Sequence, residues 1–226
     1  MGFDGSPINL QLVKYDYWLK EHTRPDFCIY NIDLWTMQVE YGKNREQLFP
    51  YFMIDKPLIK AFEQYQNYTF TEKYIPFRRY IGHRKLISGV LNDTISFYKG
   101  YYGCDWQWQA NNIKHNIDLT KCACDSAMIV AFGDFIAREQ SNGVQFLFVY
   151  APMFHTITKN NPDVPTMYAM YSQIASQFDI PILDYNHDPI CQDSACFFNK
   201  MHLNRTGAEL FTTKLAHDID SIGWLK

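Results

Sequence analysis

The sequence has little net charge and no long apolar run, and each shortage excludes a class of protein. Its 21 basic and 24 acidic residues give a formal net charge of −3, so no electrostatic attraction to nucleic acid is expected. No apolar stretch is long enough to cross a bilayer, and the first residues do not have the pattern of a signal peptide. We find no internal repeat and no low-complexity segment.

The six cysteines and the absence of a glycine fingerprint exclude further classes. Cys122 and Cys124, like Cys191 and Cys196, lack the paired spacing of a zinc site, so no metal is predicted. Two or three disulfides are compatible with export, whereas Cys28 falls in an apolar run and is predicted to be a buried thiol. No glycine-rich strand-to-helix fingerprint is present, so a nucleotide-binding Rossmann domain is a poor interpretation, and no cofactor is predicted.

Aromatic residues, by contrast, are abundant. They make up 17% of the 226 residues, with 16 Tyr, 17 Phe and 5 Trp. A chain of this length suits one domain with a substantial core, where most such rings would fill the core and subunit contacts. The alternative is that some of them line a groove for an extended or sugar-like ligand.

Apolar patterning predicts alternating strands and helices at the two ends of the chain. Strands are expected at 27–32, 144–150 and 180–184, and helices at 6–21, 126–140, 165–178 and 206–222. Continuous apolar strands that alternate with helices predict a parallel sheet covered on both faces, which is a three-layer α/β/α fold. Residues 37–120 are interpreted as an aromatic-rich insertion, carrying the substrate-facing surface, within a single domain spanning 1–226.

His202 is the first candidate for a functional side chain. It lies in a short polar turn between Phe197-Phe198 and the last predicted helix, a position at which a general base is often presented. The plainer interpretation is a solvent-facing histidine beside a helix start. Asp33 and Asp184 end predicted strands, and ligands of a parallel sheet bind beyond those ends, so these residues are expected to lie near His202.

Taken together, these pieces resemble the SGNH/GDSL hydrolases, particularly the exported branch that acts on acyl groups of cell-envelope polymers. The family's closing Asp-x-x-His block matches Asn199 and His202, followed here by Leu-Asn-x-x-Gly-Ala. Its glycine block resembles Gly2-Phe3-Asp4-Gly5, with Gly5 the better match. The resemblance implies an SGNH or flavodoxin-like sheet, His202 and Asn199 as catalytic residues, and Gly5, Asn31 and Asp33 as oxyanion or binding residues.

Three departures from the family pattern change what is expected. No Gly-Asp-Ser turn follows a first strand, because no strand precedes Ser6. We therefore expect the chain to begin after the first two strands of the fold, with the serine nucleophile upstream of Met1. Asn199 lacks the carboxylate that stabilises an imidazolium. The family's Gly-x-Asn-Asp block is replaced by Asn31-Ile32-Asp33, and an ionised Asp33 would repel an oxyanion.

The resemblance implies an esterase or acyltransferase for a small acyl ester or O-acylated carbohydrate, located in the periplasm or cell envelope. The alternative is a non-catalytic carbohydrate-binding relative of the same fold, which the missing serine and Asn199 favour. Neither interpretation implies nucleic acid or a membrane span. With two strands absent, the strand at 27–32 would become a sheet edge, and we expect residues 37–120 or a second copy of the chain to cover it.

Overall fold

The computed structural model describes residues 8–33, 36–37, 69–75, 77–78, 81, 103–108 and 124–224, which form two compact units. The first unit holds α1 (Ile8–Trp18), α3 (Phe70–Tyr74) and α5 (Ser126–Ser141). The second holds β1 (Phe27–Asn31), β2 (Gln145–Tyr150), α6 (His155–Asn160), α7 (Asp163–Gln177), β3 (Ile182–Asp184), η4 (Pro189–Gln192), η5 (Ser194–Cys196) and α8 (Arg205–Ser221). Most of the predicted insertion at 37–120 lies outside the described residues.

In the first unit, α1 packs against α5. The ring of Tyr15 meets the ring of Phe135 edge-on, with the ring centroids 5.1 Å apart. Asp125 caps α5, since its carboxylate accepts a hydrogen bond from the backbone N–H of Ala127 at 2.8 Å. The helix predicted at 126–140 is thus confirmed, and Asp125 fixes its start.

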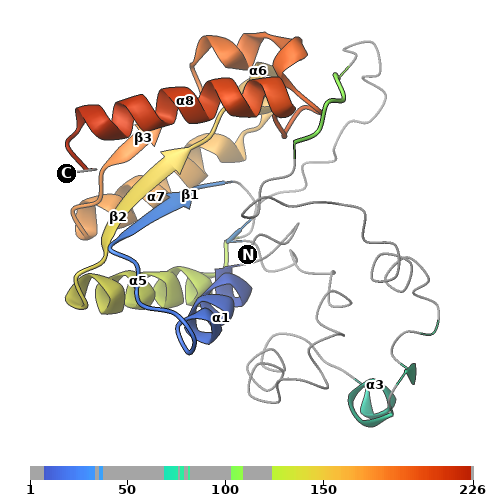
Figure 1. Ribbon diagram of the computed structural model, residues 1–226, viewed down its shortest axis with the longest axis vertical. Helices are drawn as coiled ribbons and strands as arrows, with labels where there is room; N and C mark the ends of the chain where they lie inside the picture. The colour runs from blue at the N-terminus through green and yellow to red at the C-terminus, as the bar shows by residue number, and fades with distance from the viewer. Residues whose placement is uncertain are drawn as a thin grey trace. The chain divides into compact units, whose positions relative to one another are not determined.

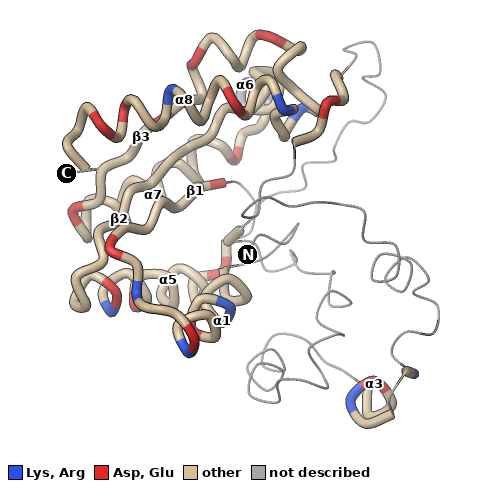
Figure 2. Tube along the Cα trace, in the orientation of Figure 1, with Lys and Arg blue, Asp and Glu red and all other residues tan. Residues whose placement is uncertain are grey.

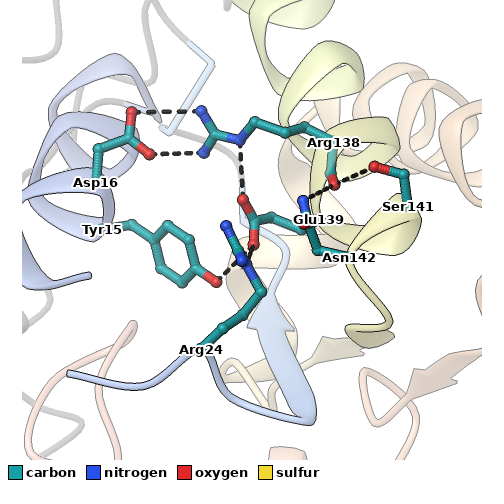
Figure 3. Close-up of polar contacts among 7 residues, drawn as sticks. All are labelled: Tyr15, Asp16, Arg24, Arg138, Glu139, Ser141 and Asn142. Atoms are coloured by element: carbon teal, nitrogen blue, oxygen red, sulfur yellow. Dashed lines mark hydrogen bonds and ion pairs between the residues drawn. The ribbon is translucent and has the colours of Figure 1, made fainter. Parts of the chain in front are cut away.

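Glu139 joins α5 to the N-terminal segment through a carboxylate that is fully buried (Figure 3). Three groups donate to it: Nε of Arg24 at 2.6 Å, the hydroxyl of Tyr15 at 2.9 Å and Nε of Arg138 at 2.8 Å. Arg138 also binds the carboxylate of Asp16 at 2.6 Å. Burial by itself would raise the pKa of Glu139, but the hydrogen bonds outweigh burial, and the pKa is lowered.

The second unit is built on a parallel sheet whose strand order is β1-β2-β3. Phe27 pairs with Gln145, and Phe148 pairs with Ile182, both in parallel register. The prediction that these three strands are parallel neighbours is therefore confirmed. The central strand β2 is buried along nearly its whole length, as expected for an apolar strand with neighbours on both sides.

Helices α7 and α8 cover opposite faces of this sheet (Figure 1). Leu147 belongs to a core cluster with Ile219 of α8. The next residue along β2, Phe148, points the other way, and its ring packs edge-on against Tyr171 of α7 with the centroids 6.2 Å apart. Side chains alternate between the faces of a strand, so the unbroken apolar run of β2 serves both helices. This unit is a mixed α/β structure with a parallel sheet.

The expectation that Cys28 is a buried thiol is wrong. Cys28 is half-buried rather than buried, because β1 pairs with β2 on one side and, within the described residues, has no strand on the other. None of the cysteines that the structure describes forms a disulfide. No described helix is both long enough and apolar enough to span a membrane.

Candidate functional site

His202 lies in a tight turn that is anchored in the core of the second unit. Phe197 and Leu203 form an antiparallel bridge across the turn, and the N–H of Phe198 donates to the carbonyl of His202 at 2.8 Å. The ring of Phe197 is fully buried and packs against the ring of Phe154. The imidazole itself is exposed. The turn therefore presents the ring to solvent while its own backbone is held in place.

The side chain of Asn199 organises the inside of this turn. Its oxygen accepts hydrogen bonds from the backbone N–H groups of Met201 at 2.8 Å and His202 at 2.9 Å. The same oxygen lies 3.0 Å from Nδ1 of the His202 ring. This is the contact that the spacing of three residues predicts, although the catalytic role of the two residues stays a prediction.

These three contacts determine the tautomer of His202. A backbone N–H only donates, so the Asn199 atom that meets two of them must be the amide oxygen and not the nitrogen. An amide oxygen only accepts, so the third contact requires a proton on Nδ1 of the ring. In the neutral ring, Nε2 is then left with its lone pair available, which is the state that a general base requires.

The His202 turn lies beyond the carboxyl end of β2. The N–H of Phe154, in the loop that follows β2, donates to the carbonyl of Lys200 at 3.1 Å. Figure 1 shows the start of α8 at the end of the sheet toward which the strand arrows point. The structure therefore brings His202 to the edge at which ligands of parallel sheets bind.

The junction between the turn and α8 depends on two residues whose roles the sequence analysis did not assign. Asn204 is buried and caps the helix, because its side-chain oxygen accepts from the N–H of Gly207 at 3.0 Å. Its amide nitrogen donates to the carbonyl of Ala195 at 2.6 Å. A Cβ on Gly207 would lie 2.1 Å from the carbonyl oxygen of Cys196. The Leu-Asn-x-x-Gly run is thus explained by a helix cap and a close backbone contact.

The other predicted site residues have different outcomes. Asn31 lies at the carboxyl end of β1 and is exposed, and its side-chain oxygen accepts from the N–H of Ala151 at 3.3 Å. Asp33 follows in the same segment and is half-buried. Gly5 lies outside the described residues.

A second polar group at the carboxyl ends of the strands contains Asp184, which the sequence analysis named, and three residues that it did not assign: Asn186, Tyr150 and Tyr168. The carboxylate of Asp184, at the end of β3, accepts from the N–H of Asn186 at 2.9 Å and from its side chain at 3.0 Å. The rings of Tyr150 and Tyr168 stack beside it, with centroids 5.9 Å apart. Burial, together with the charge of Asp184, raises the pKa of both phenols. These tyrosines therefore stay protonated and can only act as neutral hydrogen-bonding groups.

Neither a metal site nor a comparison with known proteins assigns a role to these residues. No group of His, Cys, Asp and Glu side chains among the described residues is arranged to hold a metal ion. Comparison of the chain with protein-family models, curated proteins and solved structures gives no match. The function proposed below therefore depends on the geometry of the His202 turn and on the resemblance of its motifs.

Proposed function

We propose that this chain carries the general base of an SGNH-type hydrolase or acyltransferase whose substrate class is O-acylated carbohydrate of the cell envelope. The observation that carries the proposal is the contact between Nδ1 of His202 and the side-chain oxygen of Asn199. It leaves Nε2 of an exposed ring as the proton acceptor, as a nucleophile–histidine pair needs.

The order of the sheet supports the same proposal. A flavodoxin-like sheet has the strand order 2-1-3-4-5, in which the last three strands are consecutive parallel neighbours. β1, β2 and β3 are consecutive parallel neighbours as well. Under the proposal they correspond to strands three to five of the three-layer SGNH fold, and the first two strands, with the serine nucleophile, precede Met1.

In the proposed reaction, Nε2 of His202 takes the proton of the serine hydroxyl as the serine oxygen attacks the ester carbonyl. The bond to the leaving alcohol then breaks, and His202 returns the proton to that alcohol. Water, or an acceptor hydroxyl in a transferase, releases the acyl group by the same steps. Asn199 keeps the ring oriented throughout but, being neutral, stabilises the imidazolium less than a carboxylate would. Under the proposal, the NH₂ group of Asn31 donates to the oxyanion.

The test measures p-nitrophenyl acetate turnover by the 226-residue chain and by the chain extended with whatever its gene encodes upstream of Met1. We expect negligible turnover from the first and turnover above background from the second. His202→Ala in the extended chain should lose most of that turnover, since removing a catalytic histidine costs several orders of magnitude. His217→Ala is the matched control, because His217 is also exposed but lies within α8. Turnover by the short chain that disappears in Ser6→Ala would make Ser6 the nucleophile and overturn this assignment.

A non-catalytic carbohydrate-binding relative is the second candidate. The observation that favours it is the neutral partner of His202: the ring meets an amide oxygen at the position where the family has a carboxylate. An extended chain that binds carbohydrate but turns over no acyl ester would support this candidate against the enzyme.

A further inference from the structure

The segment 103–108 is fastened to the His202 turn at both of its ends. The N–H of Arg205 donates to the carbonyl of Cys104 at 2.7 Å, and the N–H of Trp108 donates to the carbonyl of Phe197 at 2.8 Å. The ring of Trp108 also packs edge-on against Phe154, with the centroids 4.7 Å apart. The segment is therefore a fixed neighbour of the candidate site, and Figure 1 shows it beside the start of α8.

Arg205 holds the middle of the segment through its guanidinium. Nε donates to one carboxylate oxygen of Asp105 at 2.5 Å, and Nη2 approaches the other at 3.3 Å. Figure 2 shows acidic and basic positions close together where the segment passes the start of α8. Nη2 also donates to the carbonyl of Gly103 at 3.1 Å. Gly103 makes room for this contact, since a Cβ there would lie 2.7 Å from Cζ of Arg205. These bonds fix the backbone immediately before Trp106.

Trp106 lies between the two anchors with 75% of its surface exposed. Burial of a large aromatic side chain is favourable. An exposed ring whose backbone is fixed by hydrogen bonds on both sides is therefore suited to contact a ligand. Asp105 and Arg205 beside it also keep exposed surface. The segment thus offers an open aromatic face next to a hydrogen-bond acceptor and a hydrogen-bond donor.

We propose that Trp106, with Asp105 and Arg205, is a carbohydrate subsite that binds one pyranose ring of a β-linked, gluco-configured oligosaccharide. Such a ring carries its hydroxyls equatorially, so its axial C–H bonds form flat apolar faces that can stack on the indole. The equatorial hydroxyls can then bond to the carboxylate and the guanidinium. That the bound sugar is also the substrate rests on the proposed function. His202 lies in the turn directly before α8, and Arg205 is the first residue of α8. A sugar bound beside Arg205 would therefore offer its O-acyl group to His202.

The test is isothermal titration calorimetry of the 226-residue chain with cellotetraose and with chitotetraose. We expect the wild-type chain to bind at least one of them, and Trp106→Ala to raise Kd about tenfold or more. Trp106→Phe keeps a stacking ring and should stay within about threefold of the wild type. Phe70→Ala removes a ring of similar exposure, 71%, in the other compact unit and should leave Kd unchanged.

Two outcomes would overturn the subsite: no binding of either tetrasaccharide by the wild-type chain, or equal Kd for the wild type and Trp106→Ala. Circular dichroism establishes that the variants are folded. If Trp106→Ala is not folded, Asp105→Asn decides in its place, because it keeps the ring and weakens the contact to the hydroxyls; an unchanged Kd would then refute the proposal. His202→Ala separates the two proposals, since it should abolish acyl-ester turnover in the extended chain without changing Kd for the tetrasaccharide.

Discussion

The side-chain oxygen of Asn199 lies 3.0 Å from Nδ1 of His202 and accepts two backbone N–H groups of the same turn. Asn199→Ala removes this acceptor, so the neutral ring should lose its preference for a proton on Nδ1. The ring ¹⁵N chemical shifts of His202, read at a pH where the ring is neutral, report the tautomer directly. Asn199→Asp keeps an acceptor oxygen and is the control that should retain the Nδ1–H form. Identical shifts in the wild type and Asn199→Ala would contradict the tautomer assigned to the candidate base.

Glu139→Gln should lower the free energy of unfolding by roughly 3 kcal/mol at pH 7, because it removes the charge that three donors surround. The pKa of Glu139 is lowered in the folded state, so its contribution is fully present above the unfolded pKa of about 4.3. That contribution is lost as pH falls through the folded pKa. Urea unfolding should therefore give a gap between the two proteins that closes below about pH 4. Asp16→Asn, which removes an exposed partner of Arg138, should cost less than about 1 kcal/mol.

Gly207→Ala should destabilise the second unit by about 3 kcal/mol, because the added methyl group would lie 2.1 Å from the carbonyl oxygen of Cys196. Gly143→Ala is the matched comparison. Nothing lies within 4 Å of a Cβ at that position, but the φ of +88° strains any side chain, at a cost of about 1 kcal/mol. Thermal unfolding of both variants should rank them in this order. The reverse order would mean that the contact between α8 and Cys196 is not close.

Ile29 on β1 should promote self-association, because it is 51% exposed on a strand with one parallel neighbour in the described part of the sheet. Parallel strands are normally covered, and an exposed edge is a template for pairing. Light scattering of the wild-type chain should give a mass above that of the monomer, and Ile29→Lys should restore the monomer. Val130→Lys changes a similarly exposed apolar residue, at 61%, on α5 and should leave the mass unchanged. A monomeric wild-type chain would contradict this prediction.

Cys191 should resist alkylation in the folded protein. Its side chain is fully buried, its Sγ donates to the carbonyl of Tyr185 at 3.2 Å, and burial raises its pKa to about 11. At pH 8 the thiol is protonated and covered, and both conditions slow its reaction with iodoacetamide. Peptide mass spectrometry should find Cys104 modified well before Cys191, with the difference abolished in urea. Equal rates in the folded chain would show that the region around η4 opens readily.

The strands and the histidine turn could be predicted because their signals are local. An unbroken apolar run marks β2, and a spacing of three residues allows Asn199 to reach His202. The buried role of Glu139 could not be predicted, since its sequence neighbour is another charged residue, Arg138, and its partner Arg24 lies far away in the chain. A pairing of polar side chains over such a separation leaves no periodic pattern.

The same limit applies around the candidate site. The ion pair of Arg205 with Asp105, which fixes the neighbour of the exposed Trp106, joins two positions that no local motif connects. Asn204 could have been recognised as a helix cap, because asparagine is a preferred residue directly before a helix. The sequence analysis placed the helix start one residue later, at Thr206, and so missed Asn204.

The register of the sheet has a consequence for the order in which the second unit folds. Phe148 of β2 pairs with Ile182 of β3 across the two helices α6 and α7, whereas Phe27 of β1 pairs with Gln145 across a much longer intervening segment. Closing a longer loop costs more entropy, and distant pairings slow folding. We therefore expect β2, α7, β3 and α8 to condense first and β1 to dock late. Until β1 docks, one side of the apolar strand β2 is open to chaperones and to pairing with other chains.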